Sequence, residues 1–295
     1  MDQAEMSSPQ KSSNDTTSLP PTDMIHMSYE GCFQLECFAK VLAVHQMVVN
    51  GATIAVDISL DRTTMHPQGG GQPSDVGVIS SLENTTTTPI KRSVSITKVT
   101  MDRVSGVVTH SGVGDGCWEL GQVVHVAVTA DTRRIHSECH TAGHVVDSAM
   151  ARCHRILPAM KAYHFLDGPY VEYRGTIPIE ERDTLVTDLQ NAFLELVEND
   201  IPTQIQSMSR ANAAEICHPE SVDLSEYSDN DCIRIVTVAG WACPCGGTHV
   251  RSTADLKERK WNITGIKSKK GVVRIKYGQN VASLLPPIPK PIGSV

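Results

Sequence analysis

The hydrophobic pattern of the chain changes period near Asp131, and this change is the strongest constraint on the fold. Before it, short β-branched runs alternate with Gly, Asn, Asp and Ser, as in "AKVLAVHQMVV" (39–49) and "ATIAVDISL" (52–60). Short strands that follow one another closely, with turn residues between them, favour a small antiparallel barrel or sandwich. We therefore expect a β-barrel domain over residues 27–129.

After Asp131, apolar residues recur every three or four positions, as they do on one face of a helix. The stretches 131–153 and 179–200 predict two helices, with Asp131 as a candidate N-cap of the first. Strand-like runs lie between and after the helices, at 162–175, 201–209, 231–240 and 261–278. Helices combined with a mostly antiparallel sheet predict an α+β fold, which we assign to a second domain over residues 130–282.

The two ends of the chain have few residues that could form a core. Residues 1–26 are rich in Ser, Thr and Pro and predict a disordered tail, and residues 283–295 predict a loose C-terminal tail. There is neither an apolar run of membrane-spanning length nor a secretory signal. The nine cysteines, odd in number and scattered, favour a reducing compartment. We expect a cytoplasmic protein that does not bind membranes and, of the oligomeric states, favour a monomer.

The charge is unevenly spread along the chain. The net charge is −7, yet residues 251–276 contain nine Lys and Arg against Asp255 and Glu258. A basic segment on an acidic body is a candidate phosphate-facing surface. The residues that we expect to hold the phosphates of such a partner are Lys267, Lys269, Lys270 and Arg274. The charge alone leaves open a solvated basic face.

Two motifs carry potential metal ligands. In "HTAGH" (140–144) the histidines are four apart on a predicted helix, so His140 and His144 point the same way. In "CGGTH", Cys245 and His249 are also four apart. Three imidazoles and one thiolate form a tetrahedral set suited to Zn²⁺. Because about a hundred residues separate the motifs, the metal would join distant parts of a domain and not form a zinc finger.

Two other chemistries fit these residues less well. A metalloprotease helix reads HExxH, and here Thr141 stands where the general-base glutamate would be. Cys243 is a candidate nucleophile, but no local signature supports it, and a spare thiol beside the metal loop is the favoured interpretation. His136 extends the helical histidine ladder beyond what a two-ligand clamp needs.

Three stretches, in this order, resemble the alanyl-tRNA editing proteins, free-standing relatives of the editing domain of alanyl-tRNA synthetase. They are "DRTTMHPQGGGQPSDVG" (61–77), "HTAGH" (140–144) and "PCGGTHV" (244–250). Weaker matches lie at 161–173 and 266–278, so that the resemblance spans about residues 28–280.

The resemblance implies a zinc-dependent deacylase that acts in trans on mischarged Ser-tRNA(Ala), with Gly-tRNA(Ala) as a second candidate substrate. A pocket for alanine rejects serine poorly, so a second site must hydrolyse the wrong ester. The family's zinc ligands correspond to His140, His144, Cys245 and His249, with one Zn²⁺ per chain, and Thr141 matches a position implicated in sensing the substrate hydroxyl. From the glycine-rich loop, we expect Gly69, Gly70, Gly71, Gln72 and Asp75 to help enclose the aminoacyl end.

Several alternatives stay open at this stage. The zinc could be structural or catalytic, because four protein ligands are typical of a structural ion. The chain could be a non-catalytic, zinc-stabilised tRNA-binding or adaptor module, or a deacylase for another mischarged tRNA, such as that for threonine. Met160 followed by Lys161-Ala162 departs from the synthetase pattern, which tends to have a glutamine there. Since no synthetase catalytic core precedes the match, we expect neither alanine activation nor a need for ATP.

Overall fold

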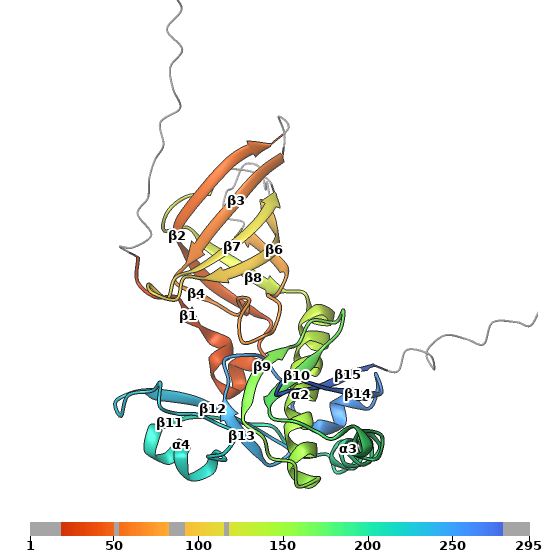
Figure 1. Cartoon of the computed structure of the whole chain (residues 1–295). Coiled ribbons are helices and arrows are strands. Elements are labelled where there is room, and N and C mark those ends of the chain that lie inside the picture. Colours follow the sequence, from red (N-terminus) through yellow and green to blue (C-terminus); the bar gives the residue numbers. More distant parts are fainter. Residues whose placement is uncertain (1–18, 50–52, 83–91, 115–117, 280–295) are drawn as a thin grey trace, which may run out of the picture.

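Two large hydrophobic cores and a smaller third one, which includes Ala213 and Ile235, lie in the parts of the chain that the structure, a computed structural model, describes: residues 19–49, 53–82, 92–114 and 118–279. One core fills a barrel, drawn at the top of Figure 1, and includes Ile58 and Val124. The other large core lies between helices and sheets below the barrel and includes Val146 and Phe193.

Antiparallel strands close the barrel in the order β2-β3-β7-β6-β5-β8. Alternate residues of strand β3 face inward: Val56 and Ile58 are buried, whereas Asp57 between them is exposed. This confirms the predicted antiparallel barrel over the alternative of a sandwich. The barrel strands are β2 (Glu36–Val49), β3 (Thr53–Leu60), β5 (Gly77–Ser81), β6 (Ser93–Met101), β7 (Val108–Gly114) and β8 (Val123–Val128).

The chain is ordered earlier than the sequence predicts. Strand β1 (Asp23–Met24) pairs in parallel with β4 (Arg62–Thr63), and His26 of the next turn is buried. The prediction of a disordered tail is therefore wrong for residues 19–26. The low apolar content of residues 1–26 predicted disorder, but hydrogen bonds hold residues 19–26 in place. The Thr22 hydroxyl donates to the Leu60 carbonyl and accepts from the amide of Val108. The rest of that tail, residues 1–18, and the C-terminal tail lie outside the described residues.

A 3₁₀ turn and a short helix connect β1 to the barrel. They are η2 (Ile25–Met27) and α1 (Tyr29–Cys32), and the Ser28 side chain caps the helix by accepting from the Gly31 amide. This segment runs from the barrel toward the lower part of the molecule (Figure 1).

Helix α2 (Ala130–Arg152) directly follows the last barrel strand and runs down through the lower part (Figure 1). Its N-cap is Thr129, so the prediction of Asp131 as N-cap is wrong. Asp131 lies in the first turn instead, where its carboxylate interacts favourably with the positive end of the helix dipole. Most of the helix from Ser137 onward is buried, which explains why this stretch contains few charged residues.

The lower part confirms the α+β class. Its sheets are β14-β15-β10-β9 and β11-β12-β13, and helix α3 packs on α2 and β14. No helix within the described ranges is both long enough and apolar enough to cross a bilayer. The strands are β9 (Ala159–Tyr163), β10 (Tyr170–Arg174), β11 (Gln204–Ser209), β12 (Cys232–Val238), β13 (Trp241–Pro244), β14 (Trp261–Lys269) and β15 (Val272–Gln279). The helices and turns are η3 (Ile179–Glu181), α3 (Arg182–Glu198), α4 (Arg210–Ile216) and η4 (Thr253–Leu256).

Candidate metal centre

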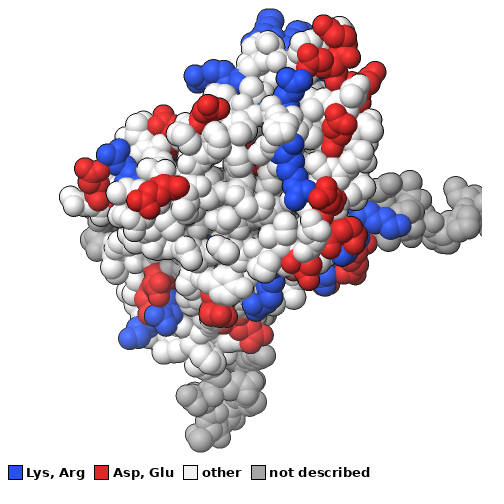
Figure 2. Space-filling view, turned by 90° about the horizontal axis from the view of Figure 1, so that it is seen from below, with Lys and Arg blue, Asp and Glu red and all other residues white. Residues whose placement is uncertain are grey.

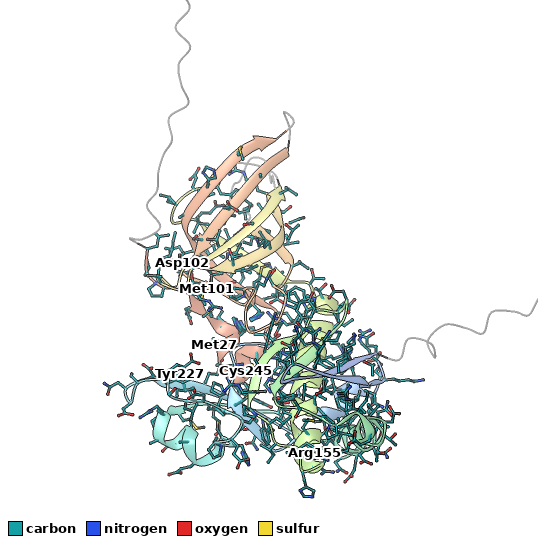
Figure 3. All side chains as sticks on the ribbon, in the orientation of Figure 1. Met27, Met101, Asp102, Arg155, Tyr227 and Cys245 are labelled. Atoms are coloured by element: carbon teal, nitrogen blue, oxygen red, sulfur yellow. The ribbon has the colours of Figure 1, made fainter. Side chains whose placement is uncertain are left out.

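Four side chains from two distant segments meet below the barrel. His140 and His144 lie one turn apart on α2, and Cys245 and His249 lie in the loop after β13, with ligand atoms all within 4.8 Å of one another. The Cys245 Sγ is 3.4 Å from Nε2 of both His140 and His249. Figure 3 labels Cys245 near the junction of the barrel with the lower part.

The donor set fits a zinc ion. Nε2 of His144 is buried and finds no hydrogen-bond partner among the described residues. An unpartnered buried nitrogen is costly unless something binds it, and a cation at the cluster would be that partner. Three imidazole nitrogens and one thiolate match the ligands that zinc prefers. These four residues could therefore hold the metal that the sequence predicts.

Burial keeps the histidines neutral, which is the form that binds metals. Desolvation, assisted by nearby Arg234, lowers the pKa of His144 to about 4. Desolvation also lowers the pKa of His140 and of His249 well below 6.5. The same burial raises the pKa of the Cys245 thiol, while the Arg234 guanidinium opposes that rise. Metal binding must therefore displace the Cys245 proton.

Gln72 connects the glycine-rich loop to the cluster. Its Oε1 accepts from His140 Nδ1 at 2.7 Å and from the Thr248 amide at 3.0 Å, and its Nε2 donates to the Thr248 hydroxyl. Gly247 leaves room for this contact, because a Cβ there would stand 2.2 Å from the His140 ring. Gln72 thus orients a candidate ligand from behind.

The three glycines form a tight turn against strand β9. Gly69 and Gln72 exchange backbone hydrogen bonds, and Gly70 and Gly71 between them have φ of +56° and +79°, as a type I′ turn requires. A Cβ on Gly71 would lie 2.4 Å from the Ala162 carbonyl oxygen, and the Gly71 carbonyl accepts from the His164 amide. Only glycine allows the loop to approach β9 this closely.

Thr141 lies behind the cluster, fully buried. Its hydroxyl oxygen is 3.3 Å from His249 Nδ1 and accepts from the Val250 amide at 3.1 Å. If His249 presents Nε2 to the metal, its Nδ1–H donates to Thr141. In this structure the residue contacts a candidate ligand.

Asp75 is also buried and has a structural partner. Its carboxylate accepts from the Arg133 Nε at 3.0 Å and from the His66 amide at 2.6 Å. Arg133 in turn donates to the Thr64 carbonyl. The pair therefore anchors the glycine-rich loop to the start of α2.

A cavity of 440 Å³ opens beside the cluster. It is bounded by α2, by β9, by the segment that contains β13 and by a loop between α4 and β12, and Val171 of β10 also lines it. His140, His144 and Cys245 line it, and Gly70 is the member of the glycine loop that does. Thr141, Gln72 and Asp75 are not among its lining residues.

Sequence reasoning missed two residues that shape the cluster. The His164 ring stacks on the His140 ring at 4.1 Å between centroids, and its Nδ1 is 2.5 Å from the Tyr277 hydroxyl. Buried Arg234 donates to the carbonyl of Cys245 and to that of Met27, and so holds the ligand loop. His164 falls within a stretch that resembled the family, whereas Arg234 is one charge in an apolar strand, which is itself a signal.

Folding neutralises part of the basic segment. Arg274 pairs with Glu172 at 2.6 Å and lies 3.9 Å over the Tyr170 ring. Lys257 and Arg259 also pair with carboxylates. Figure 2 shows blue and red side chains interspersed on the face seen from below.

Three of the four predicted phosphate contacts remain exposed. Lys267, Lys269 and Lys270 lie on the β14–β15 hairpin, outside the cavity. Among the described residues, Lys161 on β9 is the one lysine or arginine side chain that lines the cavity. The exposed hairpin and the cavity therefore carry separate positive charges.

Comparison with known proteins shows which proteins the chain resembles. Residues 233–276, which include Cys245 and His249, match the second additional domain of threonyl- and alanyl-tRNA synthetases. The alanine–tRNA ligase of Korarchaeum cryptofilum is 28% identical over 274 residues, which cover 90% of this chain and 27% of that enzyme. The ligase of Methanothermobacter thermautotrophicus is 27% identical over 287 residues, 92% of this chain and 29% of that enzyme.

These matches confirm the predicted resemblance. The sequence matches relate the chain to the tRNA synthetases that carry the second additional domain, and the His/Cys cluster includes two residues of the matched segment. The chain is thus similar to alanine–tRNA ligases over about nine tenths of its length, and its residues 233–276 match the second additional domain. It spans less than a third of the length of the relatives described above.

Proposed function

We propose that the chain is an aminoacyl-tRNA deacylase that acts in trans on Ser-tRNA(Ala), and on Gly-tRNA(Ala) as a second substrate. The observation that carries the proposal is the buried cluster of three histidines and a cysteine that opens into a cavity, in a chain related to alanyl-tRNA synthetase. A cavity of 440 Å³ has room for a small aminoacyl group and the ribose end that carries it.

The reaction adds water to the ester carbonyl and releases a free amino acid and the ribose hydroxyl. One zinc ion per chain, held by His140, His144, Cys245 and His249, would polarise that carbonyl or lower the pKa of a water. Gln72 keeps His140 oriented. His164, whose pKa burial lowers to about 3, is a neutral ring in the cavity wall and places no positive charge beside the metal.

Discrimination against alanine would come from polar groups that only serine satisfies. A site built to bond a hydroxyl rejects the analogue that lacks it, because its own polar groups are left unpaired. Thr141 remains the proposed sensor of that hydroxyl. Its contact with His249 supports a role exerted through the ligand.

The tRNA would approach over positive side chains. We propose that Lys267, Lys269 and Lys270 hold phosphates beyond the aminoacyl end, while Arg274 pairs with Glu172 and Lys161 stands at the cavity itself. Gly69, Gly70 and Gly71 would help to enclose the aminoacyl end, and Gln72 and Asp75 would hold that loop in place. The reaction would take place in the cytoplasm, with the protein as a monomer and without a membrane.

The test is a deacylation assay with seryl-, glycyl- and alanyl-tRNA(Ala), and with seryl-tRNA(Thr), at catalytic amounts of protein. We expect rapid release of serine from tRNA(Ala) and little release of alanine, with Cys245→Ala as the inactive control. Faster turnover of seryl-tRNA(Thr) would reassign the substrate. If no ester is hydrolysed above the control while tRNA still binds, the chain is a tRNA-binding module.

A further inference from the structure

Asp147 lies in the same cavity as the metal cluster, on the same face of α2. It follows His144 by three residues, about one helical turn. Both residues line the cavity, together with His140 and Cys245. One carboxylate oxygen of Asp147, Oδ1, accepts from the Tyr173 hydroxyl at 2.5 Å. This bond fixes the carboxylate, and the half-buried side chain contributes surface to the cavity wall.

The cavity wall favours a cation over an anion. Three carboxylates line it, those of Asp147, Asp223 and Glu226, against the single ammonium of Lys161 among the described residues. These carboxylates would attract an ammonium group that enters the cavity.

Asp147 is the deepest of the three carboxylates. It is half-buried, whereas Glu226 lies in an exposed part of the wall and Asp223 already accepts from the Ser225 amide. Desolvation raises the pKa of Asp147 to about 7, against the opposing effect of the Tyr173 hydroxyl. A cation that binds beside this carboxylate would favour its charged form.

A seryl or glycyl ester carries one cation, its α-ammonium group, on the carbon next to the ester carbonyl. A carboxylate one helical turn from a metal ligand could bind the ammonium while the adjacent carbonyl faces the cluster. We propose that Asp147 binds the α-ammonium group of the aminoacyl substrate and makes the site selective for esters with a free α-amine. This inference rests on the proposed function, and it predicts that N-acylated aminoacyl esters, including peptidyl esters, are poor ligands.

The test measures binding of stable analogues, so that it does not depend on turnover. The probes are 3′-(L-seryl)amino-3′-deoxyadenosine and its N-acetyl derivative, titrated calorimetrically into the zinc-loaded protein and Asp147→Asn. We expect the wild type to bind the free amine at least about tenfold more tightly than the N-acetyl form, the scale of one hydrogen bond to a charged group. Asp147→Asn should lose this preference, with unchanged affinity for the N-acetyl form and unchanged zinc content.

Matched variants separate charge from folding. Asparagine keeps an oxygen that can accept from Tyr173, so Asp147→Asn removes the charge without removing that bond. Asp223→Asn removes another carboxylate of the same wall, and we expect it to keep the preference. Equal binding of both probes to the wild type, or an unchanged preference in Asp147→Asn, overturns the inference. A wild type that binds as expected but hydrolyses no ester overturns the proposed function and leaves the role of Asp147 supported.

Discussion

Oε1 of Gln72 lies 2.7 Å from Nδ1 of His140, although the two residues are 68 positions apart. Since Oε1 also accepts from the Thr248 amide, it must be the oxygen, and His140 must carry its proton on Nδ1. The Nε2 of His140 is then left with a lone pair that faces the cluster. The glycine-rich loop thus acts on the candidate metal site through one fixed tautomer.

Replacing Gln72 should weaken metal binding without removing a ligand. We expect Gln72→Ala to lower zinc affinity by about tenfold to a hundredfold, the usual effect of losing a partner behind a ligand. Competition with a chelator would measure this. Gln72→Glu keeps an oxygen that accepts from His140, so its zinc affinity should fall less. Equal affinity of Gln72→Ala and wild type would show that His140 needs no such support.

Replacing a ligand should remove the metal. His144→Ala and Cys245→Ala should each lose most of the single zinc equivalent and melt at lower temperature, because metal binding stabilises the folded state. Elemental analysis and thermal melts are the measurements. His136→Ala and Cys243→Ser serve as controls and should keep the metal. Full retention in both ligand variants would remove the assignment.

Thr141 should affect selectivity through His249. Thr141→Val removes the hydroxyl that faces Nδ1, and we expect the ratio of serine to alanine release to fall while zinc is retained. Thr141→Ser, which keeps the hydroxyl, should restore the ratio. Deacylation rates on the two charged tRNAs give the ratio. An unchanged ratio in the valine variant would place discrimination elsewhere in the cavity.

Charge reversal on the β14–β15 hairpin should weaken tRNA binding. Each phosphate contact releases counterions, so Lys269→Glu with Lys270→Glu should reduce both the affinity and its salt dependence. Filter binding at several salt concentrations measures both quantities. Lys98→Glu, an exposed change on the barrel, is the matched control. Hydrolysis of a minimal seryl ester should not change. If affinity and salt slope stay as in the control, the hairpin is a solvated face.

His110 should make the barrel acid-sensitive. It is buried with Nδ1 on the Ile58 carbonyl and Nε2 on the Thr63 hydroxyl, and burial lowers its pKa from 6.5 to about 4. The unfolded chain therefore binds a proton more readily than the folded one between pH 6.5 and 4, so stability falls as the pH is lowered through this window. The contribution lost between pH 7 and 4.5 is about 2 to 3 kcal/mol.

Urea unfolding of the wild type and His110→Gln at both pH values measures this effect. The other buried histidines are common to both proteins, so the difference in pH dependence belongs to His110. We expect the variant to be less stable at pH 7 but to lose less stability on acidification. Parallel losses in the two proteins would contradict the assigned pKa.

The sequence by itself determined the features that rest on local repetition. The change of period near Asp131 predicted strands before it and a helix after it, because side-chain direction repeats every two residues in a strand and every 3.6 in a helix. The four-residue spacing in "HTAGH" likewise placed two imidazoles on one face. The glycines of the loop indicated a backbone conformation that other residues rarely adopt.

Only the tertiary structure decided which distant groups meet. The contact of Gln72 with His140, the closing of the barrel and the pairing of Arg274 with Glu172 depend on segments far apart in the chain, and no local pattern encodes that proximity. Asp147 reads in the sequence as one more polar residue on a helix. Its position in the cavity follows from the packing of β9, β13 and α2 around it.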